Sequence, residues 1–255
     1  MGGNRLGGIV SQLRSAAACG VEFLLPIECA ACRQLCDPGE RGLICGRCWT
    51  RLALLSHPRC ARCGHPGVTD SCSWCGLLPP YVRAVRSVCW THRGTGSAIV
   101  HALKYGGWHA VARPMAERMA RASWPDDVRD ERAAVIPVPL AETRERERGY
   151  NQSERLARTL AERWRIPLWG DVLERARATE TQTRLTPAER LANVSGAFRV
   201  RCAPLRALRH AHVVLVDDVV TTAATLNACA AALIAGGARI VSYVTFGRAP
   251  AAGDR

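Results

Sequence analysis

The sequence of 255 residues contains few aromatic and comparatively few acidic residues. Phenylalanine, tyrosine and tryptophan together make up 5% of it. Its 22 acidic residues are outnumbered by 35 basic ones, which gives a formal net charge of +13. Such a charge suits partners rich in phosphate, either nucleotides or nucleic acid, although a genome that prefers arginine would produce the same imbalance.

Long apolar runs are also missing. No segment approaches the about 20 apolar residues that a membrane-spanning helix needs. Residues 1–26 carry two arginines but no apolar run long enough for a secretory signal. We therefore expect a cytoplasmic protein with no membrane span. Ile9, Leu13 and Ala16 follow helical spacing, so residues 1–27 are predicted to form a short amphipathic helix.

Cysteine, by contrast, is abundant, with 13 residues. Eight of them form four C-x2-C pairs within residues 28–80, namely Cys29/Cys32, Cys45/Cys48, Cys60/Cys63 and Cys72/Cys75. Two such pairs can place four thiolates around one Zn²⁺ at about 2.3 Å. A reducing compartment disfavours disulfides, and four repeated pairs do not resemble a single redox motif. Residues 28–80 are therefore predicted to be a module with one or two structural Zn²⁺ ions.

The pairing of these ligands is open at this point. Neighbouring pairs in the sequence can share an ion, and so can the first pair with the third. Cys36, His57 or His65 could replace a ligand. The remaining cysteines are expected to be small buried apolar side chains, and they are Cys19, Cys89, Cys202 and Cys229.

The zinc module has two alternative uses. It can supply folding energy that so short a segment cannot obtain from an apolar core. It can also bind nucleic acid, because Trp49 and Trp74 could stack on bases. Arginines surround the cysteines, namely Arg33, Arg41, Arg47, Arg51, Arg59 and Arg62.

Residues 213–225 combine an apolar run, two carboxylates and a threonine-rich loop. The run 213–216 is typical of a buried parallel strand, and Asp217 and Asp218 are expected to end it. The Ala- and Leu-rich residues 225–233 predict a helix, which Gly236 closes. Backbone N–H groups at a helix start bind anions, whereas carboxylates hold sugar hydroxyls or a divalent cation. This stretch therefore predicts a phosphate site at the carboxyl end of a parallel sheet.

The remaining pattern predicts an α/β domain over residues 81–255, with a twisted, mainly parallel sheet and helices on both faces. Predicted strands cover residues 82–90, 135–140 and 240–246, and predicted helices cover 95–103, 111–122 and 153–164. Residues 126–132 are expected to be an exposed link, 172–198 a mobile lid, and 248–255 a frayed tail.

A second phosphate-binding turn is predicted after the strand at residues 135–140. Arg144, Arg146 and Arg148 follow this strand, and Gly149 is expected to place Arg148 on a turn. Because the arginines alternate with glutamates, a self-paired helix face is the competing interpretation, mainly for Arg144 and Arg146.

The stretch 213–225 resembles the phosphoribosyl pyrophosphate (PRPP) signature of type I phosphoribosyltransferases. The resemblance implies a Rossmann-like fold, contacts of Asp217 and Asp218 with the ribose hydroxyls, and Mg²⁺ bound with PRPP. It further implies a 5′-phosphate loop made of Thr221, Thr222, Ala223, Ala224 and Thr225. Relatives usually carry glycine at position 223, where a positive φ would strain alanine by roughly 1–2 kcal/mol.

Further motifs stand in the order seen in the ComF family. They are the C-x2-C pairs, residues 103–106, 137–139, 148–152, 181–182, Arg190 with Asn193, 196–198 and the acidic loop. The resemblance implies catalytic roles for Asp217, Asp218 and Arg148. It also implies pyrophosphate or lid contacts for Lys104, Arg148, Gln182 and Arg190.

The ComF family includes competence proteins implicated in handling single-stranded DNA. The resemblance therefore implies a role in DNA uptake, with single-stranded DNA and a DNA-uptake helicase as partner classes. Phosphoribosyl transfer, non-catalytic handling of single-stranded DNA, and a purine-type phosphoribosyltransferase are the three alternatives. Neither a nucleophile, a general base nor a base-recognition segment is visible, so the sequence leaves the acceptor and the enzymatic status open.

Overall fold

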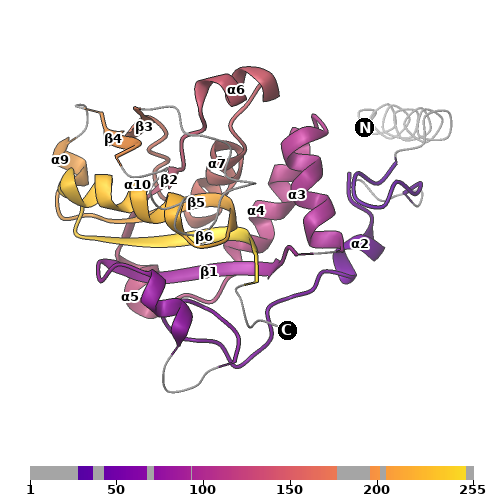
Figure 1. Ribbon diagram of the computed structural model, residues 1–255, viewed down its shortest axis with the longest axis horizontal. Helices are drawn as coiled ribbons and strands as arrows, with labels where there is room; N and C mark the ends of the chain where they lie inside the picture. Colours follow the sequence, from indigo (N-terminus) through magenta and orange to yellow (C-terminus); the bar gives the residue numbers. More distant parts are fainter. Residues whose placement is uncertain are drawn as a thin grey trace, which may run out of the picture.

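The computed structural model of the chain describes residues 28–36, 43–67, 72–92, 94–176, 196–201 and 205–250. Within these residues, a four-stranded sheet has the order β1-β6-β5-β2 (Figure 1). Its strands are β1 (Val82–Trp90), β2 (Arg132–Pro137), β5 (His212–Val220) and β6 (Ile240–Arg248). All neighbours in this sheet pair in parallel. The predicted α/β fold with a mainly parallel sheet is confirmed.

The two central strands owe their position to continuous apolar sequence. Every residue of β5 from His212 to Val216 is buried, and every residue of β6 after Ile240 is buried. A strand that alternated apolar and polar side chains would suit a sheet covered on one face only. Near-continuous burial instead indicates that the sheet is covered on both faces.

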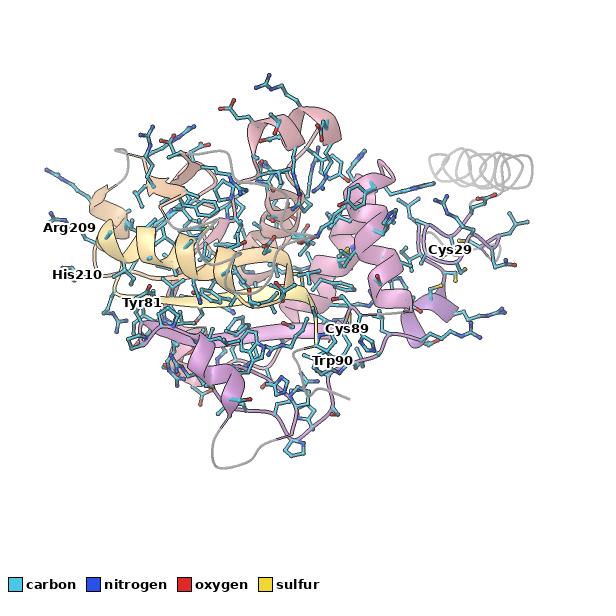
Figure 2. All side chains as sticks on the ribbon, viewed as in Figure 1. Cys29, Tyr81, Cys89, Trp90, Arg209 and His210 are labelled. Carbon is cyan, nitrogen blue, oxygen red and sulfur yellow. The ribbon has the colours of Figure 1, made fainter. Side chains whose placement is uncertain are left out.

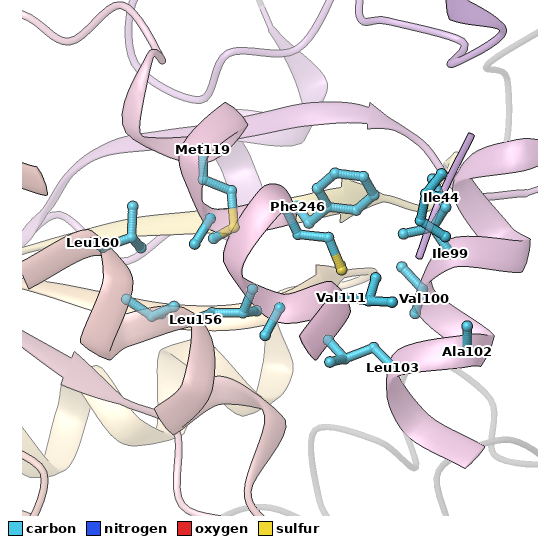
Figure 3. Packing of buried hydrophobic residues seen from close by; sticks show 14 of the residues in the cluster. Ile44, Ile99, Val100, Ala102, Leu103, Val111, Met119, Leu156, Leu160 and Phe246 are labelled. Atoms are coloured by element: carbon cyan, nitrogen blue, oxygen red, sulfur yellow. The ribbon is translucent and has the colours of Figure 1, made fainter. Parts of the chain in front are cut away.

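Three helices cover one face of the sheet: α3 (Thr95–Tyr105), α4 (Ala112–Ala120) and α7 (Gln152–Trp164). Ile99, Met119 and Leu160 from these helices pack in one apolar cluster with Phe246 of β6 (Figure 3). The first group of zinc-module cysteines joins this cluster through Cys29, Cys45 and Cys48.

The helix α10 (Ala224–Ala235) covers the opposite face, where its Leu226 and Leu233 cluster with Tyr243 of β6. The second cysteine group joins this other cluster through Cys63. The two halves of the cysteine-rich segment therefore pack into different apolar clusters. In Figure 2, Cys29 lies at the opposite end of the view from Arg209 and His210.

The remaining elements are short. They are α2 (Gly46–Thr50), η1 (Ser73–Leu77), η2 (His109–Val111), α5 (Asp126–Glu131), α6 (Glu142–Arg148), α9 (Leu205–Leu208), and the antiparallel pair β3 (Leu173–Arg175) and β4 (Phe198–Val200). No helix in the described part of the chain is long and apolar enough to cross a membrane.

Three sequence-based expectations fail here. The expected exposed link at residues 126–132 is largely the helix α5, which buries Val128 and whose Asp127 accepts two hydrogen bonds from Arg83. The expected tail begins too early, because Arg248 is the fully buried last residue of β6. The third is the mobile lid predicted over residues 172–198, which is wrong at its two ends, because Leu173 of β3 and Phe198 of β4 are buried in the antiparallel pair. The middle of that lid and the predicted helix at residues 1–27 lie outside the described residues.

Candidate functional site

A cavity of about 410 Å³ opens at the carboxyl edge of the sheet. Residues that follow all four strands line it: Thr91 after β1, Val138 after β2, Thr221 after β5 and Ala249 after β6. Open parallel α/β sheets bind their ligands at this edge. The cavity therefore lies where the acidic loop and the arginine-rich segment were predicted to meet.

Asp217 and Asp218 both line the cavity, but they lie within β5 and not in a turn after it. The predicted strand end at residue 216 is therefore wrong, since β5 continues to Val220. The Oδ1 atom of Asp217 accepts hydrogen bonds from the Ser153 hydroxyl and from the Asp218 backbone N–H, both at 2.9 Å. Burial and the neighbouring charge of Asp218 raise the pKa of Asp217 to about 7.

Lys104, in the last turn of α3, provides the countercharge. Its Nζ lies 2.6 Å from Oδ2 of Asp218. Burial lowers the pKa of Lys104, but the charge of Asp218 outweighs this effect, so the pKa lies above its ordinary value. Among the 35 basic residues of the chain, Lys104 is the single lysine. The compact ammonium group of this lysine therefore lies at the acidic pair, where the other basic residues of the chain would offer a planar guanidinium.

The threonine-rich loop leads into α10 at the edge of the same cavity. Thr221, Ala223, Ala224 and Thr225 line the cavity. Thr222 does not: its Oγ1 atom is buried and has no hydrogen-bond partner among the described residues. Ala223, the residue before α10, has φ 59° and ψ 7°, the left-handed conformation. The condition for strain at this alanine is therefore met.

We expect Ala223→Gly to be neutral or to raise the free energy of unfolding by up to about 1 kcal/mol. Glycine relieves about 1–2 kcal/mol of left-handed strain and costs about 0.5–1 kcal/mol of backbone entropy. The matched control is Ala224→Gly, one residue later in right-handed helix, which should be destabilised by about 0.5–1 kcal/mol. Urea unfolding of both variants tests this, and equal destabilisation of the two would contradict it.

The pKa of Asp217 gives a prediction for pH. Because its pKa is raised above the ordinary 3.8 to about 7, the folded chain binds an extra proton between these values. This group's contribution to stability is thus greatest in acid and declines as pH rises from about 4 to 7. Asp217→Asn keeps an acceptor for Ser153 and cannot ionise. The free energy of unfolding of this variant, minus that of the native chain, should therefore rise between pH 5 and pH 8 in urea unfolding. A difference that is independent of pH would refute the raised pKa of Asp217.

The helix α6 contributes two arginines to the cavity wall. Arg144 and Arg148, four residues apart on the same side of α6, both line the cavity. Arg146 instead pairs with Glu142 at 3.3 Å. Self-pairing is therefore confirmed for Arg146 and wrong for Arg144. Arg148 is not on a turn but is the last residue of α6, and Gly149 follows it with φ 79°.

Residues 150–152 attach α6 and α7 to the rest of the site. The Tyr150 hydroxyl donates to the Leu103 carbonyl, next to Lys104. Asn151 caps α7 by accepting from the Ser153 N–H at 3.0 Å, and its amide donates to the Val138 carbonyl at 3.1 Å. The Gln152 side chain accepts a hydrogen bond from Arg148. This segment therefore fixes α6 relative to both α3 and the end of β2.

Sequence reasoning did not single out Ser153. Arg144 was named only within the predicted arginine-rich turn, with self-pairing as the competing interpretation, and Arg175 lay within the predicted lid. Arg175 of β3 also lines the cavity, with its guanidinium 5.3 Å from the ring centroid of Phe198, and burial lowers its pKa. Only Arg144 had a local signal, its spacing of four residues from Arg148. The predicted pyrophosphate or lid residues Gln182 and Arg190 lie outside the described residues.

The eight cysteines of the four pairs form two groups. Each group has its four sulfur atoms within 4.8 Å of one another, and the groups are Cys29/Cys32/Cys45/Cys48 and Cys60/Cys63/Cys72/Cys75. Close sulfur pairs are 3.7 and 3.8 Å apart in the first group and 3.5 and 3.4 Å apart in the second. A tetrahedron with Zn–S bonds of about 2.3 Å has edges of about 3.8 Å. The donor sets thus fit one Zn²⁺ each.

This arrangement settles the pairing: neighbouring pairs combine, and the first does not combine with the third. Cys36, His57 and His65 belong to neither group. Cys89 and Cys229 are buried, as expected, whereas Cys19 and Cys202 lie outside the described residues.

The two tryptophans proposed for base stacking serve the fold instead. Trp74 is 2% exposed, and the Arg248 guanidinium lies 4.1 Å from its ring centroid. Trp49 packs edge-on against Phe246 and lies 3.4 Å from the guanidinium of Arg118. Arg62 likewise holds the segment by donating to the Pro79 carbonyl at 2.7 Å. Trp74 is therefore not accessible for stacking, and Trp49 is half-buried.

The comparisons with known proteins agree with a zinc-binding segment followed by an α/β domain. Residues 20–80 match the double zinc ribbon domain, and residues 113–254 match the phosphoribosyl transferase domain. The DNA utilization protein YhgH of Escherichia coli O157:H7 is 31% identical over 230 residues, covering 85% of this chain and 95% of that protein. Its namesake from Salmonella typhimurium is 32% identical over 228 residues, with the same shares.

Competence protein F of Haemophilus influenzae is 38% identical over 94 residues, which cover 37% of this chain and 41% of that protein. The two four-cysteine groups agree with the double zinc ribbon match, and the mainly parallel sheet with helices on both faces agrees with the phosphoribosyl transferase match. The chain belongs to the ComF family, in which a double zinc ribbon precedes a phosphoribosyltransferase domain.

Proposed function

We propose that the cavity binds PRPP and that the chain uses this site in DNA utilisation. The supporting observation is the meeting, in one cavity, of the acidic pair, the start of α10 and several cations. The start of α10 suits the 5′-phosphate, because its N–H groups and helix dipole favour an anion. Thr221, Ala223, Ala224 and Thr225 would surround that phosphate, and Thr222, whose hydroxyl is buried, would contribute to the loop through its backbone.

Asp217 and Asp218 are proposed to hold the ribose hydroxyls. Carboxylates at this position would also favour the positive charge that develops on the ribosyl ring during transfer. Lys104 and Arg148 are proposed to contact the pyrophosphate, since both line the cavity. Gln182 and Arg190 are proposed to complete these contacts from the lid.

Mg²⁺ is proposed to bind together with PRPP. Hydrogen bonds and the ion pair already use three of the four carboxylate oxygens of Asp217 and Asp218. Mg²⁺ commonly binds through one or two carboxylates together with phosphate oxygens. The residues present therefore fit an ion held mainly by pyrophosphate, and they do not form a complete cage of protein ligands.

A thermal-shift titration tests the binding roles. PRPP with Mg²⁺ at 100 times its Kd should add about 2.7 kcal/mol, which corresponds to a rise in Tm of about 5–10 °C for a chain of this size. Asp218→Asn should lose most of this rise. Glu147→Gln, on the exposed side of α6, is the control and should keep it. The roles are wrong if Asp218→Asn responds like the native chain.

Phosphoribosyl transfer is proposed as the associated reaction. The C1–O bond to pyrophosphate would break with its electron pair leaving on pyrophosphate, while the acceptor atom forms the new bond to C1 and releases its proton. PRPP-dependent pyrophosphate release, measured with nucleobases, ammonia and single-stranded DNA as acceptors, tests this step. Release with a purine base alone would favour the purine-type alternative, and no release with any acceptor would indicate a binding protein.

Non-catalytic handling of single-stranded DNA is the second candidate. Two observations favour it: the names of the relatives, DNA utilization protein and Competence protein F, and the net charge of +13. Affinity for single-stranded DNA should then fall steeply with salt, because phosphate contacts release counterions. A DNA-uptake helicase and a cytoplasmic location remain proposals, and the latter suits eight thiols that must stay reduced for zinc.

A further inference from the structure

Tyr105 is an exposed aromatic side chain at the wall of the cavity. It follows Lys104 at the end of α3, and it is 63% exposed. The exposed large hydrophobic side chains of the described residues are Leu35, Leu54, Leu77 and Tyr105. Tyr105 alone among these four lines the cavity. An open aromatic ring thus borders the part of the cavity that contains the cations.

Two basic side chains, one from α3 and one from α6, contact this ring. The imidazole of His101, one helical turn earlier in α3, has its ring centroid 4.9 Å from that of Tyr105, at an angle of 45°. The Arg148 guanidinium of α6 lies 5.5 Å from the Tyr105 ring centroid. Despite both contacts, most of the Tyr105 ring remains exposed. Aromatic faces beside guanidinium groups are typical of sites that bind unpaired nucleobases.

Arg144 supplies a second cation in the same place. It lies one turn before Arg148 on α6 and lines the cavity together with Tyr105. An unpaired base carries its phosphate a few ångströms from the ring, so a base on Tyr105 would bring its phosphate into the range of long arginine side chains. Among the described residues that line the cavity, Tyr105 is the one with an aromatic side chain.

We propose that Tyr105 is the stacking platform for an unpaired nucleobase and that Arg144 contacts the phosphate attached to this base. The base would then lie next to the PRPP position, so the proposal rests on the proposed function for what occupies the rest of the cavity. It concerns binding alone and includes no transfer step. The shared ligand chemistry is a nucleobase with a phosphate, carried either by single-stranded DNA or by a free nucleotide.

The test measures fluorescence anisotropy of a labelled oligothymidylate on the zinc-loaded full chain. Loss of one stacked base is expected to weaken binding about tenfold in Tyr105→Ala. Tyr105→Phe keeps the ring and should stay within about twofold of the native chain. Arg144→Ala should reduce the salt dependence by the equivalent of about one phosphate contact. Arg146→Ala, two residues away and paired with Glu142, is the matched control and should leave the salt dependence unchanged.

Competition by thymidine monophosphate distinguishes the two sources. If thymidine monophosphate competes with the same affinity per base as the oligothymidylate, the ligand is a free nucleotide. If it competes much more weakly, the ligand is single-stranded DNA. Both outcomes support the platform. Equal binding of oligothymidylate by Tyr105→Ala and the native chain overturns it, and so does the absence of binding to either probe. Calorimetry of the native chain with PRPP separates this failure from failure of the proposed function, since PRPP binding by the native chain does not depend on which residue stacks the base.

Discussion

Lys104→Met is expected to lower the free energy of unfolding by about 2–4 kcal/mol and to abolish measurable PRPP binding. The ammonium group lies 2.6 Å from Asp218, whose side chain is 4% exposed. Removing one partner of a buried ion pair typically costs about 3–5 kcal/mol, because the other charge remains buried without compensation. Our range is lower because the Lys104 side chain is 25% exposed.

The pH dependence of this variant follows from the same argument. The positive charge of Lys104 lowers the pKa of Asp217, so without Lys104 the pKa of Asp217 should rise further. The loss of stability should then be smallest in acid, below the ordinary pKa of 3.8 where Asp217 is protonated in both states, and should grow as pH increases. A loss that is independent of pH would show that Lys104 acts through packing and not through its charge.

A double-mutant cycle isolates the pair. In Lys104→Met/Asp218→Asn the buried charge is gone, so much of the stability lost in Lys104→Met should return. PRPP binding should not return, since both proposed contacts are missing. Lys104→Arg is informative as well: it keeps the charge but replaces a compact ammonium with a planar guanidinium. We expect it to keep most of the stability and to bind PRPP more weakly.

Loss of zinc from the second cysteine group is expected to damage the PRPP site at a distance. Cys63→Ser should contain one zinc ion less than the native chain, lose at least about 3 kcal/mol of stability, and bind PRPP at least about tenfold more weakly. Structural Zn²⁺ contributes about 10–16 kcal/mol of binding free energy in isolated zinc-finger peptides, so a lost ion releases the segment that it folds.

Two connections join this segment to the site. The Asn227 amide of α10 donates to the Leu77 carbonyl at 2.7 Å, and α10 begins at the proposed phosphate loop. The buried guanidinium of Arg248 donates to the Cys63 carbonyl. Arg248 also pairs in register with Val220, the residue before Thr221. Unfolding of this zinc ribbon would therefore release both α10 and the end of β6.

The matched control for zinc is Cys36→Ser, since Cys36 belongs to neither sulfur group. It should keep two zinc ions per chain and native PRPP affinity. Elemental analysis, thermal unfolding and PRPP titration of both variants provide the measurements. If Cys63→Ser loses its zinc while PRPP affinity stays native, the second ribbon does not support the site.

The sheet could be predicted from the sequence because its strands are apolar over most of their length. Local patterns were sufficient for β1, β2, β5 and β6 and for the helices that bury an apolar stripe. The helix α5 could not be predicted, since it is charged except for Val128. Likewise, β5 continues through Asp217 and Asp218 because it pairs with β6 as far as Arg248, which no local pattern of β5 indicates.

For the candidate site, the sequence identified the residues with local motifs and missed those placed by tertiary contacts. The acidic pair, Arg148 and the threonine-rich loop except for Thr222 line the cavity. Arg175 joins them because β3 packs near α10, which no local spacing indicates. Trp74 was expected to be available on the surface, and this expectation is wrong. The sequence does not reveal that the end of β6 brings Arg248 onto the Trp74 ring.

Isothermal titration calorimetry of the zinc-loaded full chain with PRPP and Mg²⁺ tests the central claim most directly. The account predicts saturable binding at one site per chain. Asp217→Asn/Asp218→Asn, in which both carboxylates are neutral, should lose this binding while remaining folded by circular dichroism. Absence of binding to the native chain at millimolar PRPP, or equal binding by the double variant, would contradict the account.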